Sequence, residues 1–145
     1  MREIVKAACQ ASAIELDEAG PIMRAAFRGE HGQFMLFLKV DEQRQVFSCT
    51  AMAPVEAGAR LDAVMELLHR LNQVHDVACF DVGPDDGVIR CRVGVDVEGQ
   101  GLSQALCDNV VFGCAAALDR ALPAIMAVVV NGLAPRRALL AIADG

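Results

Sequence analysis

The sequence has no tryptophan and no tyrosine, and the only aromatic residues among its 145 are six phenylalanines. A core must therefore be built mainly from Ala, Val, Leu, Ile and Met, within an apolar fraction of 54%. Lys and Arg form no long run, the formal net charge is −6, and no Trp or Tyr is present to stack on bases. These absences argue against a surface that binds nucleic acid.

Long apolar runs are also missing. The longest, residues 124–130, is too short to cross a bilayer as a helix. The N-terminal segment contains no apolar region long enough for a secretory signal. A chain of this length can bury roughly 70% of its unfolded surface in a single core. We therefore expect one domain, residues 1–145, in the cytoplasm and without membrane contact.

The cysteines lack the spacing of a redox or metal motif. No two of the six are arranged as CxxC, and a chain of this size does not need disulfide bridges to fold. We expect free and mostly buried thiols in a reducing compartment. The six are Cys9, Cys49, Cys79, Cys91, Cys107 and Cys114.

What is present is a clear succession of helical and strand-like patterns. Apolar residues recur at helical spacing in four segments and at strand length in five others, with turn residues between them. The order predicts an α+β fold, α-βββ-α-ββ-α with a short final helix, in which a three-stranded antiparallel meander and a hairpin pack with helices. The predicted helices are 3–16, 59–74, a long one from Ser103 to Asn131-Gly132 with a kink or restart at Pro123, and 135–144. The predicted strands are 22–28, 33–40, 45–52, 78–82 and 88–97.

Turn lengths predict the register of two strand pairs. If residues 41–44 form the turn of the meander, Val40 faces Gln45. If residues 83–87 join the last two strands, the facing pairs are Val82–Ile89, Asp81–Arg90, Phe80–Cys91 and Cys79–Arg92.

One face of the meander does not have the composition of a solvated surface. Met35 and Phe37 lie at its centre, whereas a fully solvated sheet face is normally polar. We predict that this face is a dimer or partner interface, unless one helix of the same chain covers it. The predicted interface residues are Arg24, Arg28, Met35, Phe37, Val46 and Thr50.

The acidic, glycine-rich stretch of residues 78–101 does not fit a calcium loop. Counted from Asp81, the sixth position is Asp86 instead of Gly, and the twelfth is Arg92 instead of Glu. Asp96 and Glu98 can form an acid and base pair in principle, but no His, Lys or Arg follows within twenty residues to tune them, so we favour a solvated strand end.

Other residues with catalytic or ligating chemistry are scattered. The three histidines, at 31, 69 and 75, have no metal-ligand spacing, and Gly99-Gln100-Gly101 lacks the lysine of a phosphate loop. The sequence therefore predicts no catalytic residue, no metal and no cofactor.

An alternative hypothesis is a small ligand-binding or thiol-dependent enzyme domain of unknown substrate. Its pocket would lie between the sheet and the long helix, with Cys79, Arg90 and Arg92 closest to the chemistry. Cys79 is the one thiol predicted to lie off the core face, beside Arg92.

Four stretches resemble the YbjN family of small bacterial proteins, whose fold is related to the type III secretion chaperones. They are LLHRLNQ (67–73), CFDVGPDDGVIRCRV (79–93), GLSQAL (101–106) and LDRALPAIMAVVVNGLAPRRAL (118–139). Within them, the residues that match the family pattern, and that we expect to be structural, are Asn72, Phe80, Asp81, Gly87, Asp119, Pro123 and Gly132.

The resemblance implies a non-enzymatic α+β domain, often dimeric, among regulators of bacterial sensory or stress responses. The secretion chaperones, which are more distantly similar, bind an unfolded segment of a client protein on apolar patches. We therefore expect a protein-binding module that forms a homodimer and holds an unidentified client or regulator protein. The resemblance supplies no catalytic residue.

Overall fold

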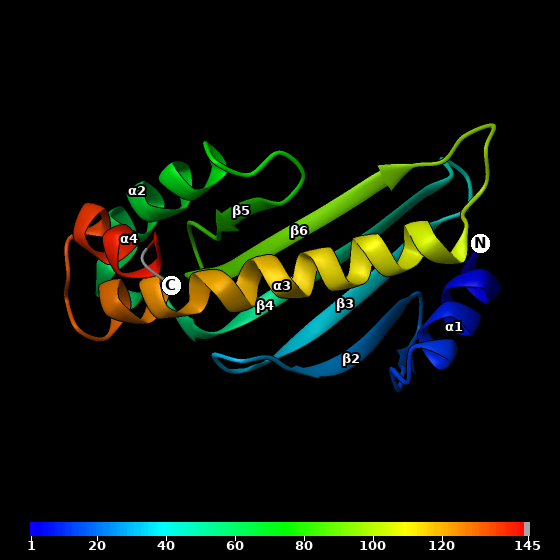
Figure 1. The fold of residues 1–145 in the computed structure, drawn as a ribbon, viewed down its shortest axis with the longest axis horizontal. Helices are drawn as coiled ribbons and strands as arrows, with labels where there is room; N and C mark the ends of the chain where they lie inside the picture. Colours follow the sequence, from blue (N-terminus) through cyan, green and yellow to red (C-terminus); the bar gives the residue numbers. More distant parts are fainter. Residues whose placement is uncertain (144–145) are drawn as a thin grey trace.

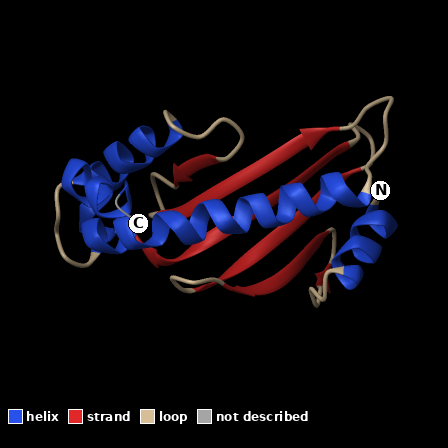
Figure 2. Ribbon diagram, in the orientation of Figure 1, coloured by secondary structure: helices blue, strands red, loops and turns tan. Residues whose placement is uncertain are grey.

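The computed structural model describes residues 1–143, which form one antiparallel sheet with helices packed on one of its faces (Figures 1 and 2). The strand order is β1-β2-β3-β4-β6-β5, so the predicted α+β class is confirmed. The strands are β1 (Asp17–Ala19), β2 (Ile22–Arg28), β3 (Gln33–Asp41), β4 (Val46–Glu56), β5 (Cys79–Val82) and β6 (Val88–Asp96). The helices are α1 (Arg2–Ala11), the 3-10 turn η1 (Gly58–Arg60), α2 (Leu61–Asn72), α3 (Gln104–Val129) and α4 (Pro135–Ala143). Asp144, the predicted end of the last helix, lies outside the described residues.

Pairing of β4 with β6 joins the meander and the hairpin into a single sheet. The ladder runs from Val46 opposite Asp96 to Met52 opposite Arg90, and a bulge follows Met52. The helix α2 separates the two units in the chain and packs on β5 at the sheet edge. The side chains on one face are therefore continuous across all the strands.

The register of the β5–β6 hairpin is the predicted one at every pair, from Cys79 opposite Arg92 to Val82 opposite Ile89. The β3–β4 register differs from the prediction by two residues. Val40 faces Phe47 instead of Gln45, because the turn spans 42–45 and Gln45 adopts a positive φ of 55°. A shift of two residues keeps every side chain on its predicted face.

The first helix is shorter than predicted, and the strand β1 was missed. The helix ends at Ala11 because Ala13 has a φ of 58°, in the left-handed region. The N–H groups of Ala13 and Ile14 donate to the carbonyls of Gln10 and Cys9, at 3.1 and 2.8 Å. This is the Schellman arrangement, which normally uses glycine at the left-handed position.

The long helix α3 remains one helix through Pro123 and begins at the predicted cap, where the Ser103 hydroxyl accepts from the Leu106 N–H at 3.1 Å. By length and composition alone, α3 is apolar enough to span a bilayer. Sequence analysis had not predicted this, because it considered only the short uninterrupted apolar run of residues 124–130. Over half of the most apolar window of α3, 56%, is buried in the fold. A buried core helix has the same composition.

The core lies between α3 and the inner face of the sheet. Phe47, Leu36, Leu38 and Ile89 have no solvent exposure and project from three neighbouring strands. Above them, the Cys114 thiol donates to the carbonyls of Cys49 and Cys91, at 3.3 and 3.2 Å. A side chain as small as cysteine lets the helix approach the strand backbones this closely.

The helix α2 buries a stripe of four residues, Val64, Leu67, Leu68 and Leu71. Met65 on the same helix is 52% exposed, whereas Leu67 is fully buried. One side of α2 therefore faces the core, and Met65 lies on the side that faces solvent.

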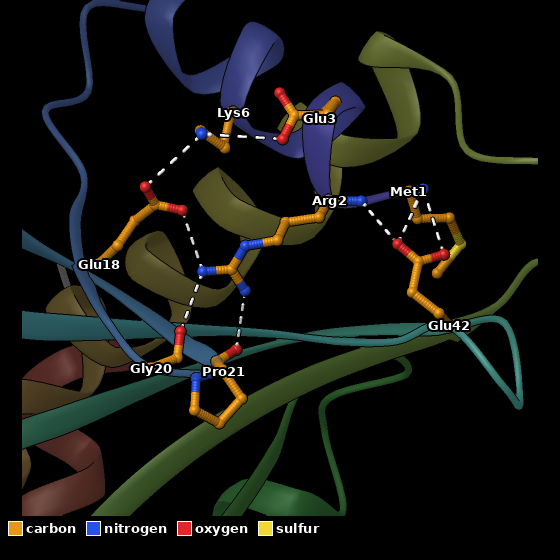
Figure 3. A network of polar contacts seen from close by, with 8 residues as sticks. All are labelled: Met1, Arg2, Glu3, Lys6, Glu18, Gly20, Pro21 and Glu42. Atoms are coloured by element: carbon orange, nitrogen blue, oxygen red, sulfur yellow. Dashed lines mark hydrogen bonds and ion pairs between the residues drawn. The ribbon is translucent and has the colours of Figure 1, made fainter.

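Polar contacts fix the start of α1 against two turns of the sheet (Figure 3). The Arg2 guanidinium donates to the carbonyls of Gly20 and Pro21 and to Glu18, each at 3.0 Å. The Arg2 side chain, followed by the charge of Lys6, lowers the pKa of Glu18. The Arg2 N–H donates to Glu42 at 3.0 Å and lowers the pKa of that carboxyl, with a smaller effect from the N-terminal ammonium group.

The side-chain amide of Asn72 joins the end of α2 to the edge strand β5. Its nitrogen donates to the Phe80 carbonyl at 2.9 Å, and its oxygen accepts from the Phe80 N–H at 2.7 Å. The amide thus satisfies both backbone groups of one strand residue, as a neighbouring strand would.

Asp119 makes an equivalent link between α3 and the β2–β3 turn. Its carboxylate accepts from the N–H groups of Glu30 and His31, at 3.0 and 2.9 Å. A Cβ on Gly29 would lie 2.1 Å from the carboxylate, so the approach requires glycine at that position.

We expect Ala13→Gly to stabilise the protein by about 0.5–1 kcal/mol, because glycine adopts the left-handed conformation without steric strain. The gain is smaller than the full strain energy, because glycine also increases the conformational entropy of the unfolded chain. Urea denaturation measures the free energy of unfolding. Ala11→Gly, two residues earlier and inside the helix, is the control and should destabilise by about 0.5–1 kcal/mol. Destabilisation by both changes would contradict the assignment of strain to Ala13.

We expect Asn72→Ala to lower the free energy of unfolding by about 2 kcal/mol, because two hydrogen bonds are lost and the Phe80 backbone groups are left unpaired. The exposed neighbour Gln73→Ala serves as the control and should change stability by less than about 0.5 kcal/mol. Equal effects of the two substitutions would show that the Asn72 amide contributes no more than a surface residue.

Candidate functional site

All six residues of the predicted interface lie on the outer face of the sheet, opposite α3. Across the strands, Arg24 stands beside Phe37 and Phe37 beside Thr50. Met35 lies two residues from Phe37 on β3, next to Ala26 on β2 and Met52 on β4. The remaining two, Arg28 and Val46, lie at opposite ends of the same face.

No helix in residues 1–143 covers this outer face. The long helix packs on β4 and β6 from the inner side, and the other helices lie at the two ends of the molecule (Figure 1). Met35 keeps 38% of its surface exposed, and Ala26 and Arg28 are also exposed. The alternative that a helix of the same chain covers the face is therefore wrong.

Two hollows meet at Met35 and Ala26. One, of about 600 Å³, is open on the outer face between Met35, Met52 and Pro54. The other, of about 850 Å³, continues from Arg24 past the edge of β2 toward the segment that links α1 to β1. The outer face is therefore hollowed beside Met35, where side chains of a partner can be received.

Charges of both signs surround this apolar centre. Arg24 is paired with Asp17 on the neighbouring strand β1. Lys39 and Arg92 are exposed on the same face, as is Asp96 at its far end. The surface is therefore amphipathic, with no excess of one sign comparable to the acidic balance of the whole chain.

The acidic hairpin forms a turn, and its residues contact one another. The Arg90 guanidinium pairs with Asp86 at 3.1 Å, instead of with the cross-strand neighbour Asp81 that the register suggested. Asp86 also accepts from the Val88 N–H at 2.9 Å, and these two contacts lower the pKa of Asp86. A Cβ on Gly83 would lie 1.9 Å from this carboxylate.

The remaining acidic pair, Asp96 and Glu98, closes a strand end. The Asp96 side chain accepts from the Glu98 N–H at 2.9 Å, and both residues are exposed. Within residues 1–143, no group of three or more His, Cys, Asp or Glu side chains has the arrangement needed to hold a metal ion. His75 is half-buried against Phe80, with ring centroids 5.3 Å apart.

Five of the six thiols are free and buried, as predicted, and Cys79 is exposed. The neighbouring Cys114 thiol, together with burial, raises the pKa of Cys49 and Cys91. The Cys9 thiol and burial similarly raise the pKa of Cys107. These thiols resist conversion to the nucleophilic thiolate.

Cys79, Arg90 and Arg92 do not line a pocket between the sheet and α3. The pairing of β5 with β6 places all three on the outer side of the hairpin, and none of them borders the hollows described above. The predicted location of an enzymatic pocket is therefore wrong, because the space beneath α3 is filled by core side chains.

Sequence comparison decides the family, because the model of YbjN, described as "Putative bacterial sensory transduction regulator", matches residues 1–127. The chain belongs to the YbjN family. Among curated proteins, none matches the sequence significantly.

The fold of this YbjN-family chain is similar to two solved structures. YbjN from E. coli superimposes with a TM-score of 0.64 and 14% identity, over 84% of this chain and 88% of that one. The Yersinia pestis type III secretion chaperone SycH, solved in complex with a stable fragment of YscM2, gives a TM-score of 0.52 and 12% identity. That match covers 80% of this chain and 95% of SycH. The chaperone-like fold that the sequence predicted is confirmed.

We expect one thiol of the native protein to react readily with Ellman's reagent, because Cys79 alone among the six is exposed. Cys79→Ser should remove that reaction, and the five other thiols should react only after unfolding in denaturant. A Cys79 rate above that of a free thiol at neutral pH would favour the thiol-dependent alternative. Several fast-reacting thiols in the native state would contradict the buried positions.

Proposed function

We propose that this YbjN-family chain is a non-enzymatic, cytoplasmic protein-binding module whose outer sheet face is the binding surface. The observation that supports this most is the uncovered outer face, where exposed Met35 borders a hollow and half-buried Phe37 lies two residues further along the strand. Buried apolar side chains surrounded by exposed polar ones are the usual composition of a protein interface. SycH, which has a similar fold, was solved with a fragment of another protein bound.

A second copy of the chain is the first occupant that we propose for this face. Two-fold symmetry places the same surface on both subunits, so the surface must complement itself. The exposed cations Lys39 and Arg92 and the exposed Asp96 provide opposite charges on one face. Two chains that each carry a formal charge of −6 can therefore meet here with less repulsion than at their acidic surfaces.

The non-enzymatic part of the proposal rests on what the described residues bury. Apart from the five buried cysteines, no polar or charged residue among them is buried, so no carboxylate, imidazole or amine is desolvated in the way that catalytic acids and bases commonly are. We further propose that the family-motif residues serve the fold. Asn72 and Asp119 make the links described above, and Gly87, with a φ of 70°, accepts from the Ala57 N–H at 2.8 Å.

We expect Phe37→Asp to convert a dimer to a monomer, because a carboxylate at the apolar centre would be buried without a partner. Light scattering across a wide concentration range measures the solution mass. Met65→Asp is the matched control, because Met65 is also an exposed apolar residue but lies on α2. It should leave the mass unchanged.

The other outcomes are equally informative. A dimer that survives Phe37→Asp would place self-association elsewhere and contradict the proposed interface. A wild-type protein that is monomeric at every concentration would exclude the second copy and leave the face to a different protein.

A further inference from the structure

A separate pocket of about 390 Å³ lies on the other side of the molecule from the proposed interface, where α2, α3 and α4 meet (Figure 1). Its apolar lining includes Leu71 from α2, Ala117 and Ala121 from α3, and Leu139 and Ile142 from α4. This volume is within the range of about 300–1,000 Å³ that is usual for small-molecule sites. The three helices thus enclose an apolar space that can hold a short hydrocarbon chain.

Two arginines and a histidine border this apolar space. Arg70 comes from α2, His75 from the segment that follows it, and Arg120 from α3. None of the described lining residues is acidic, although the whole chain has a formal net charge of −6. A smaller adjoining hollow of about 320 Å³ shares Arg120 and His75 and has Asp76 at its border. The pocket is therefore a local concentration of positive charge on an acidic protein.

The two arginines retain unused hydrogen-bonding capacity. Arg70 has one contact with Glu66, at 3.6 Å, and its Nε atom is buried without any hydrogen-bond partner. Arg120 is exposed and makes no side-chain hydrogen bond or ion pair with residues 1–143. The Arg70 side chain as a whole is nevertheless 39% exposed, so other guanidinium N–H groups remain accessible. An anion that binds between the two arginines would accept charge-assisted hydrogen bonds from their accessible N–H groups.

We propose that the pocket between α2, α3 and α4 binds an anionic amphiphile, a carboxylate or phosphate monoester carried on a short alkyl chain. The anionic head group accepts from Arg70 and Arg120, and the alkyl chain lies against Leu71, Leu139 and Ile142. Each half of the ligand matches one half of the lining. A neutral alkane would leave the guanidinium groups unpaired, and a bare inorganic anion would leave the apolar lining without a partner.

Isothermal titration calorimetry tests this with four probes of known chemistry: octanoate, octyl phosphate, 1-octanol and inorganic phosphate. We expect octanoate or octyl phosphate to bind with one site per chain and at least about tenfold more tightly than 1-octanol, because charged hydrogen bonds are worth this much. Whichever of these two probes binds more tightly shows whether the pocket prefers a carboxylate or a phosphate head group. Inorganic phosphate alone should give no saturable binding.

Arg120→Gln should weaken binding of the preferred probe by about tenfold or more. The matched control is Arg44→Gln, because Arg44 is an exposed arginine in the β3–β4 turn that borders neither the pocket nor the hollows of the outer face, so this change should leave binding unchanged. Val74→Glu is a second test variant, because Val74 borders the pocket and is 76% exposed, so the change does not disturb the core. Its carboxylate should compete for the arginines and also weaken binding.

Three results would overturn the proposal. They are equal affinity for octanoate, octyl phosphate and 1-octanol, an effect of Arg44→Gln as large as that of Arg120→Gln, and the absence of saturable binding for both anionic amphiphiles. None of these results bears on the outer sheet face, because the light-scattering experiment with Phe37→Asp is read without any ligand.

Discussion

The close contact between α3 and the sheet is the interaction on which the rest of the structure depends. The Cys114 thiol lies on the carbonyls of Cys49 and Cys91, which belong to the paired strands β4 and β6. These two strands come from the meander and the hairpin, which α2 separates in the chain. One helix therefore holds both units in a single sheet, and the small side chain at the contact sets how closely it lies.

This contact explains why the sheet has two different faces. A sheet that packs helices on one side alternates apolar and polar residues along its strands. Ser48, Thr50 and Arg92 follow that rule at outer positions, whereas Met35 and Phe37 depart from it. The fold gains no core packing from these two side chains, because the helices lie on the other side. Their apolar character is better explained by an intermolecular contact, and this supports the proposed interface.

Local patterns predicted the parts of the fold that depend on neighbouring residues in the chain. The β5–β6 register followed correctly from a five-residue turn, and the face of each meander strand followed from alternation. Sequence reasoning missed β1 and the early end of α1, since Ala13 adopts a conformation that normally indicates glycine. Alternation along a single strand is enough to assign its residues to the outer face of the sheet. The pocket between α2, α3 and α4 has no comparable local pattern and was not predicted.

That pocket was missed because its lining comes from segments distant in the chain and from both helix and loop. The adjacent residues Asp119 and Arg120 show how α3 connects these regions. Asp119 holds the β2–β3 turn, which leads into the strands of the outer face, and Arg120 borders the pocket formed with α4. A rigid helix that places neighbouring side chains on different partners fixes the position of both surfaces at once. The same helix that organises the core therefore also positions the two candidate binding surfaces, and core residues such as Ala117 and Ala121 form part of the pocket lining.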